Sequence, residues 1–240
     1  MKAQDLIQLY ELKKQQYGNK AYQHLSTLLN EAKEEHKTYF LNSEGAQKSI
    51  EQGKQPDHEQ SWRAFKGKSL EKLIEHIIKE AVEQMGLKII NGNTLEKTQG
   101  KSLSDELSNI KRKLLIDYGI NGCHLPDVDL IIYEPMQETV IAVLSSKVTL
   151  RERVAQTGYW KLKLLESNIT KKIKVFFITL DEDGTLTTQK PTRKGRAIVE
   201  TDTDGCYVLT ENYIEESDHV KTFDKFIPDL QKIIKKNNPK

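Results

Sequence analysis

Two short apolar segments, residues 125–133 and 139–147, carry the clearest pattern in the chain and predict a pair of β-strands. Both are rich in β-branched residues and are bounded by residues that favour turns. Residues 134–138 between them have the length and composition of a hairpin loop. The pattern therefore predicts an antiparallel hairpin.

The register of this hairpin decides which side chains meet. If Glu134 faces Val140, the polar residues gather on one face at the open end of the hairpin. That face carries Asp127 opposite Lys147 and Asp129 opposite Ser145. The other face, a candidate core face, carries Val128, Leu130, Ile132, Ala142 and Leu144.

Helical periodicity is strongest over residues 62–85, where the apolar side chains fall on one broad arc. Glu71 does not join the polar side, because it projects between Ile78 and Val82. A carboxylate aimed at a core needs an ion-pair partner or a metal, since an isolated buried charge is costly. The alternative is that Glu71 lies near the helix start, where the helix dipole favours an acid.

The remaining elements predict an α/β fold with a mixed central sheet flanked by helices. Further helices are expected over 103–115, 149–167 and 220–236, and further strands over 87–90, 173–180 and 206–209. A right-handed crossover would place the strand at 173–180 parallel to the one at 139–147.

The first 60 residues are polar, with modest helical periodicity, and 42–60 have the composition of a loop or linker. We therefore expect an N-terminal helical region over 1–60 and the main domain over 61–240.

Composition excludes several classes of protein but does not decide whether the chain binds nucleic acid. The 240 residues carry a formal net charge of only +2, so the charge total neither requires nor excludes nucleic acid. Cys123 and Cys206 are too few for a disulfide framework and form no zinc motif. Neither a membrane span nor a signal peptide is indicated, so a cytoplasmic protein is expected. Walker and Rossmann patterns are missing, so no nucleotide cofactor is expected.

The hairpin carries a resemblance to a known family. Pro126-Asp127 on one strand, followed by Ser145-Ser146-Lys147 on the next, resembles the PD-(D/E)xK nuclease signature. The segment 147–156 is similar to the lysine-to-helix segment of type II restriction endonucleases, as is 67–71 at the preceding helix. The resemblance implies a restriction-endonuclease-like core and Mg²⁺-dependent cleavage of double-stranded DNA at a short, palindromic sequence, in restriction–modification defence.

One departure from that signature changes the expected site. The family has an acid two residues before the lysine, where this chain has Ser145. Glu71 is the preferred replacement, because its side chain faces inward from a helix expected to pack on the sheet. Asp129 and Glu152 are the alternatives, although Glu152 also suits a capping box with Thr149.

The resemblance gives these residues roles. Asp127 and Glu71 would hold Mg²⁺, which prefers oxygen ligands, and the backbone carbonyl of Ser146 would add another. Lys147 would orient the attacking water and offset charge on the phosphate. A palindromic target implies a two-fold symmetric homodimer.

Two basic segments are candidates for DNA contact. The first is a probable loop at 187–196, which contains Lys190, Arg193, Lys194 and Arg196. The second is the start of the helix after Lys147, with Arg151, Arg153 and Gln156. For any single one of them, an ordinary solvated surface position is the simpler interpretation.

Two other functions stay open at this point. One is a nuclease of the same core that recognises DNA structure, such as a junction resolvase or a repair nuclease. The other is a DNA-binding module that kept the fold and lost catalysis, which Ser145 makes credible.

Overall fold

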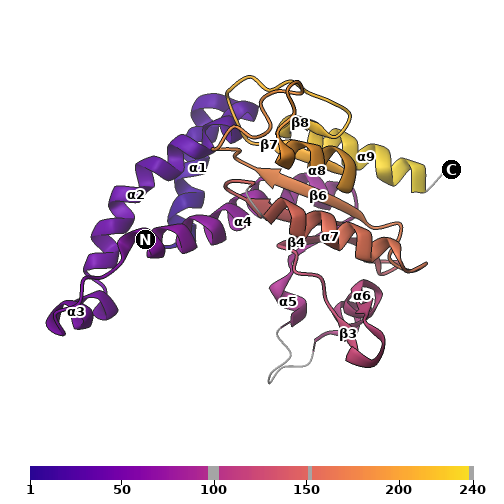
Figure 1. Cartoon of the computed structure of the whole chain (residues 1–240), viewed down its shortest axis with the longest axis horizontal. Helices are drawn as coiled ribbons and strands as arrows, with labels where there is room; N and C mark the ends of the chain where they lie inside the picture. Colours follow the sequence, from indigo (N-terminus) through magenta and orange to yellow (C-terminus); the bar gives the residue numbers. More distant parts are fainter. Residues whose placement is uncertain (97–102, 151–152, 238–240) are drawn as a thin grey trace.

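A six-stranded mixed β-sheet forms the centre of the protein in a computed structural model, which describes residues 1–96, 103–150 and 153–237 (Figure 1). The strand order is β1-β4-β5-β6-β7-β8. The first three strands pair antiparallel, and β5 to β8 run parallel. The strands are β1 (Lys88–Asn91), β4 (Leu130–Glu134), β5 (Thr139–Lys147), β6 (Lys174–Thr179), β7 (Gly205–Val208) and β8 (Val220–Thr222), with β2 (Ile116–Asp117) and β3 (Cys123–His124) forming a separate ribbon.

Helices cover both faces of the sheet (Figure 1). One face packs against α1 (Ala3–Tyr17), α2 (Leu25–Leu41), α4 (His58–Gln84) and α9 (Phe226–Asn237). The other packs against α5 (Asn93–Glu96), α6 (Asp105–Leu114), α7 (Arg153–Leu165) and α8 (Lys194–Asp202). The short helix α3 (Glu44–Glu51) follows α2. This arrangement confirms the predicted α/β class with a mixed sheet.

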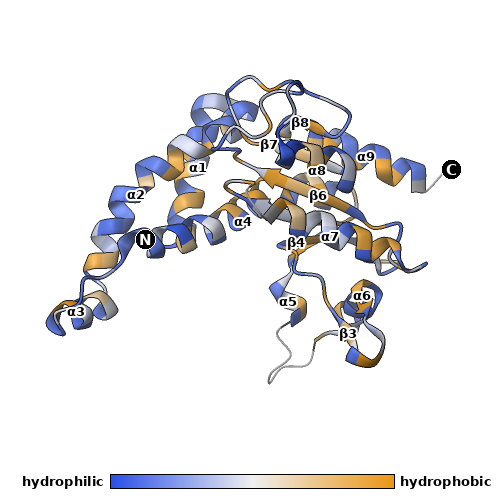
Figure 2. Cartoon of the chain, in the orientation of Figure 1, coloured by the Kyte–Doolittle hydropathy of each residue, from blue (hydrophilic) through white to orange (hydrophobic). Residues whose placement is uncertain are grey.

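Coverage on both faces explains the apolar runs in the central strands. Val175, Phe176, Phe177 and Ile178 of β6 are all buried, because successive side chains enter different cores. Figure 2 shows β6 as a continuous hydrophobic strand, whereas α2 is largely hydrophilic. Among the described residues, no helix has the length and apolar character needed to cross a membrane.

The predicted hairpin forms, but its register shifts once. Tyr133, not Glu134, faces Val140, so the prediction is wrong next to the loop. An irregularity between Ile132 and Tyr133 then restores the expected register, with Leu130 opposite Leu144. The pairs from Leu130 to Ile132 therefore have the predicted register, although those next to the loop do not.

The N-terminal helices share a core with the sheet. Leu6 and Leu25 belong to the same buried cluster as Leu130 of β4. The expected linker at 42–60 is instead partly helical, since it contains α3 and the start of α4, which Asp57 caps by accepting from the Gln60 amide (2.9 Å).

Two other helices begin later than expected. The structure has α7 beginning at Arg153 instead of Thr149, and the expected cap residue Glu152 lies outside the described residues. The segment at 220–236 begins as strand β8, and α9 starts only at Phe226.

Candidate active site

The candidate site lies where β4 begins and β5 ends, beside the end of β1. Asp129 directly precedes β4, and its backbone is held from both sides. Its amide donates to the Leu144 carbonyl (3.0 Å), and its carbonyl accepts from the Gly92 amide (2.9 Å). The position of Asp129 is therefore fixed by the sheet itself.

The Asp129 carboxylate binds the end of β5. Its Oδ2 atom accepts from Lys147 Nζ at 2.7 Å and from the Ser146 amide at 2.6 Å. The Asp129 and Lys147 side chains are 12% and 20% exposed, so water screens this ion pair only partly. The amine keeps two further N–H donors for a ligand.

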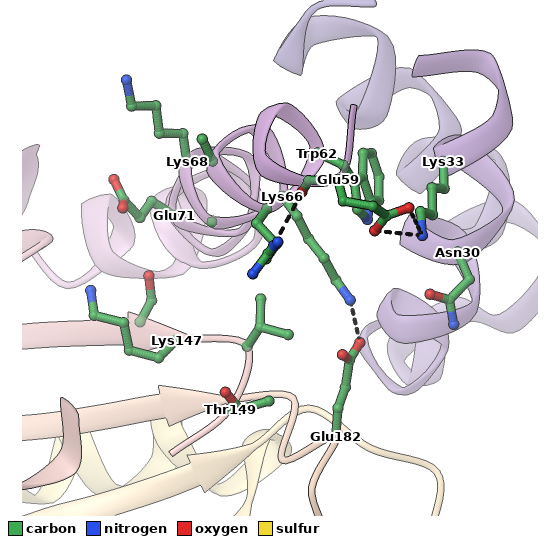
Figure 3. Close-up of a pocket in the computed structure, with 15 residues that line it drawn as sticks. Asn30, Lys33, Glu59, Trp62, Lys66, Lys68, Glu71, Lys147, Thr149 and Glu182 are labelled. Carbon is green, nitrogen blue, oxygen red and sulfur yellow. Dashed lines mark hydrogen bonds and ion pairs between the residues drawn. The ribbon is translucent and has the colours of Figure 1, made fainter. Parts of the chain in front are cut away.

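Glu71 reaches the same place from α4 (Figure 3). Its carboxyl group lies near enough to Asp129, Lys147 and the Asn91 side chain to interact with all three. Burial, followed by the charge of Asp129, raises the pKa of Glu71 to about 7, although Lys147 and the Asn91 side chain oppose the shift. The predicted inward orientation of Glu71 thus brings it to Asp129 and Lys147.

This arrangement suits a divalent cation. Two carboxyl groups lie near one ammonium, and burial beside the charge of Asp129 favours a proton on Glu71 by raising its pKa. A bound cation would replace that proton. Among the described residues no group of three or more His, Cys, Asp or Glu is placed around one point. Two carboxylates with remaining positions for water match Mg²⁺, which is commonly held in this way.

Asn91 and Gly92 support the site, a role that the sequence did not predict. Asn91 Oδ1 accepts from the Asn93 amide and side chain (both 3.0 Å), which leaves its Nδ2 free to donate to Glu71. A Cβ on Gly92 would lie 2.0 Å from the Val128 carbonyl oxygen, so only glycine fits there. The Asn-Gly-Asn sequence of residues 91–93 is typical of a turn, but its contact with the residues before β4 is long-range and has no local signal.

Asp127 does not face Lys147, so that part of the predicted site is wrong. Its side chain is exposed and accepts from Gln156 Nε2 at 3.0 Å. The pairing of β4 with β5 starts at Leu130, and Asp127 lies before it, outside the ladder. Asp129, the alternative acid, holds the position next to the lysine.

The two serines before Lys147 are buried in β5. Ser145 lies opposite Phe177 of β6. The Ser146 amide contacts Asp129, and its hydroxyl makes no hydrogen bond within the described part of the chain. Coordination of a metal by the Ser146 carbonyl stays a prediction.

Arg196, one of the predicted DNA ligands, is buried inside the protein. Its side chain is fully buried, and its guanidinium donates to the backbone carbonyls of Leu186 and Glu215 and to the Glu200 carboxylate. With its donors used inside the protein, Arg196 holds two loops together.

The other DNA-binding candidates have separate outcomes. Lys190, Arg193 and Lys194 are exposed, but α8 begins at Lys194, so the segment is only partly a loop. Arg151 lies outside the described residues, and Arg153 is described only as the start of α7. Their contacts with DNA stay predictions, as does that of Gln156.

An open cleft of about 660 Å³ leads from this site along α4 toward α2 (Figure 3). Glu71, Ser146 and Lys147 lie at one end, and Asn30 of α2 lines it as well. The site is therefore accessible to a large ligand.

Comparison with known proteins shows that the chain is similar to type II restriction endonucleases. A family model described as "BsaWI restriction endonuclease type 2" matches residues 106–229. A protein of Methanocaldococcus jannaschii described as "putative type II restriction enzyme MjaVIP" is 35% identical over 223 residues, which cover 89% of this chain and 94% of that protein. HpyAORF263P of Helicobacter pylori, described as a probable type II restriction enzyme, is 40% identical over 119 residues, 49% of this chain and 58% of that protein.

A solved structure shows the same fold. The crystal structure of the specific restriction endonuclease AgeI in complex with DNA aligns with a TM-score of 0.51 at 19% identity, covering 74% of this chain and 70% of that one. At this level of identity the likeness concerns the fold.

Proposed function

Because the chain belongs to the BsaWI family of type II restriction endonucleases, we propose that Glu71, Asp129 and Lys147 form the centre with which it hydrolyses DNA. The family's activity is site-specific cleavage of DNA, so the protein is a deoxyribonuclease. It uses a divalent metal, as the family does in general. The assignment of Mg²⁺ and of the three residues is the proposal.

One observation carries the assignment: two carboxyl groups and one amine converge at the open end of a hairpin. Asp129 Oδ2 is 2.7 Å from Lys147 Nζ, and Glu71 lines the same cleft as Lys147, close enough for the charge of Asp129 to raise its pKa. The raised pKa of Glu71 supports a site that exchanges a proton for a cation. Ser145 then needs no acidic role, because Glu71 supplies the second carboxylate from α4.

Each residue has a separate task in phosphodiester hydrolysis. Mg²⁺ held by Asp129 and Glu71 would stabilise the charge that develops on the phosphate and the leaving oxygen. Lys147 orients the attacking water with its remaining N–H donors and offsets the charge of the phosphate. The water oxygen bonds to phosphorus as the bond to the leaving oxygen breaks. Asn91 keeps the Glu71 carboxylate aimed at Asp129.

We also propose that the enzyme acts as a homodimer on a palindromic site. One chain contributes one such centre, and cutting both strands symmetrically requires two centres related by a two-fold axis. The loss of catalysis that Ser145 suggested is disfavoured, because the second carboxylate is supplied elsewhere. Recognition of DNA structure alone does not fit the family.

The two aspartates of the Pro-Asp-Val-Asp segment offer a matched test. Asp129→Asn should lower the single-turnover rate of plasmid cleavage with Mg²⁺ by about 10³-fold or more, since it removes a metal ligand and the partner of Lys147. Asp127→Asn should retain the rate within about tenfold, because the Asp127 side chain is exposed and bonds to Gln156 instead of Lys147. Wild type should give discrete fragments.

The reverse result would assign the catalytic acid to a different residue. If Asp129→Asn cuts nearly as fast as wild type and Asp127→Asn does not, the catalytic acid is Asp127 and the proposed arrangement is wrong. A smear from wild type would instead contradict site specificity.

A further inference from the structure

The cleft beside the active site has an excess of basic side chains. Two of its three carboxylates, those of Glu59 and Glu182, are matched by lysines. Lys33 lies 2.8 Å from Glu59, and Lys66 lies 2.6 Å from Glu182. The basic residues that line it are Lys33, Arg63, Lys66, Lys68 and Lys147. A surface of this charge attracts the phosphates of a nucleic acid backbone.

Arg63 and Lys68 are the basic residues available to a ligand. Both are exposed, and neither forms a salt bridge with a carboxylate in the described part of the chain. Arg63 donates one hydrogen bond, from Nε to the Glu59 backbone carbonyl (3.2 Å), so its terminal N–H groups can still bind a ligand. Phosphate oxygens match such donors in geometry and charge.

One row of residues on α4 runs along the cleft to the active centre. Glu59, Arg63, Gly67 and Glu71 are spaced by four residues along α4 and line the same cleft. Arg63 lies eight residues before Glu71, which corresponds to about 12 Å of helix. This length spans a few successive phosphates of a DNA strand, spaced about 3.4 Å along the duplex axis.

Gly67 leaves this line open in the middle. It lies inside a long helix, where glycine is unfavourable compared with alanine. No atom would lie within 4 Å of a Cβ at this position, so packing does not require glycine there. The missing side chain does give a ligand access to the helix surface between Arg63 and Glu71.

Lys66 crosses the cleft from α4 to Glu182 (Figure 3). Glu182 Oε1 also accepts from Ser26 Oγ at 2.9 Å. The Glu182 carboxylate thus occupies the Lys66 amine, to which a phosphate oxygen could bind in the same way. Side-chain exposures of 11% for Lys66 and 28% for Glu182 leave the pair accessible to an exchange of partner.

We propose that this cleft carries the DNA backbone on one side of the scissile phosphate. Arg63 and Lys68 bind phosphates of the same strand, Gly67 leaves room for that strand, and Glu182 holds Lys66 until a phosphate replaces it. The inference rests on the proposed function, because it starts from Glu71 and Lys147 as the point of cleavage.

The first experiment counts phosphate contacts. A fluorescein-labelled duplex of mixed sequence is bound without metal in the Asp129→Asn background, and the dissociation constant is measured over a range of salt. Arg63→Gln and Lys68→Gln should each weaken binding and lower the log–log salt slope by about 0.9, the value for one lost contact on duplex DNA. Lys79→Gln is the control, because Lys79 is exposed on α4 outside the cleft.

The second experiment uses Gly67→Leu. Leucine favours the helix, so the melting temperature should stay the same or rise. Its side chain would enter the cleft, and binding should fall by about tenfold or more. Unchanged binding by a folded Gly67→Leu protein would overturn the proposal.

The third experiment removes the competing carboxylate. Glu182→Gln should tighten binding of the duplex by about threefold to tenfold, because Lys66 is released from its ion pair. Glu83→Gln, which removes the partner of Lys79 outside the cleft, should leave binding unchanged. Weaker binding by Glu182→Gln would contradict the exchange of partners.

These outcomes are separate from the test of the active centre. Salt slopes that do not change in Arg63→Gln and Lys68→Gln, together with lost cleavage in Asp129→Asn, would refute the DNA path and leave the catalytic assignment intact. Reduced slopes with full cleavage by Asp129→Asn would support the DNA path and refute the catalytic assignment.

Discussion

Two partly buried clusters of lysine and carboxylate lie at opposite ends of the parallel strands. At one end, Glu71 and Asp129 face a single amine, that of Lys147. At the other end, the single carboxylate of Asp204 binds both Lys161 and Lys174. The first cluster has an excess of acid and the second an excess of base.

This imbalance sets the electrostatics of each cluster. Burial alone would raise the pKa of Asp204, but hydrogen bonds from Lys161, Lys174 and the Val175 amide outweigh it and lower the pKa. Burial and the charge of Asp129 instead raise the pKa of Glu71 to about 7. Asp204 is fully satisfied within the protein, whereas Glu71 and Asp129 share one ammonium, and an added proton or cation offsets the excess of negative charge.

The contrast separates a structural ion cluster from a functional one without reference to any motif. A satisfied cluster stabilises the fold and has no use for a ligand. An unsatisfied one costs stability until its ligand binds, which is typical of active sites.

The largest expected difference is between the two lysines. Lys147→Met should lower single-turnover cleavage by about 10³-fold, because water and phosphate lose the ammonium donor that Asp129 holds in place. Lys161→Met should leave cleavage per folded molecule close to wild type. It should lower the unfolding free energy by about 1–3 kcal/mol, since Asp204 loses one of its two lysine partners in a partly buried site.

Single-turnover cleavage of plasmid DNA would measure the activity of both variants, and urea unfolding would measure their stability. The comparison fails if Lys161→Met is folded and inactive, or if Lys147→Met still cuts at a rate near wild type.

Local patterns could predict much of this centre. The period of two in 125–133 and 139–147 predicted the hairpin, and its register is right from Leu130 to Ile132. The period of the long helix placed Glu71 inside the apolar arc, and the structure has it beside Asp129. In each case the signal lies within one element or one short connection.

Long-range contacts could not be read in the same way. Whether Asp127 or Asp129 faces Lys147 depends on where β4 begins, and Gly92 of the distant β1 turn fixes that point by hydrogen-bonding the Asp129 carbonyl. Arg196 looked like one of several basic loop residues, yet tertiary packing buries it completely. Glu200, four residues later on the same helix, was the one local signal of an internal partner.

A smaller effect is expected from Asn91, which supports Glu71 in the cluster with an excess of acid. Asn91→Ala should raise the Mg²⁺ concentration needed for half-maximal cleavage by about 10–100-fold, because Glu71 loses the donor that orients it. Asn109→Ala is the matched control, since Asn109 also donates to a glutamate, Glu138, but outside the site (2.7 Å). Equal magnesium dependence in both variants would contradict a role for Asn91.

The smallest expected effect is a pH dependence of stability in the metal-free protein. The folded pKa of Glu71, about 7, lies above its usual value near 4.5. Between these values the folded protein binds a proton that the unfolded chain has lost, so the contribution of Glu71 is complete below about pH 4.5 and is lost as the pH rises through 7. Glu71 is partly exposed, so the change should be about 1–2 kcal/mol, less than the full shift would give.

Urea unfolding in EDTA between pH 5 and about pH 8 would measure this effect. Wild type should lose stability relative to Glu71→Gln over this range, whereas Glu80→Gln, an exposed site on the same helix, should follow wild type. Mg²⁺ should add more stability at the high-pH end, where it no longer competes with the proton. Parallel curves for wild type and Glu71→Gln in EDTA would mean that Glu71 is already ionised in the folded protein, and the excess of acid at this end of the sheet would then be neutralised in another way.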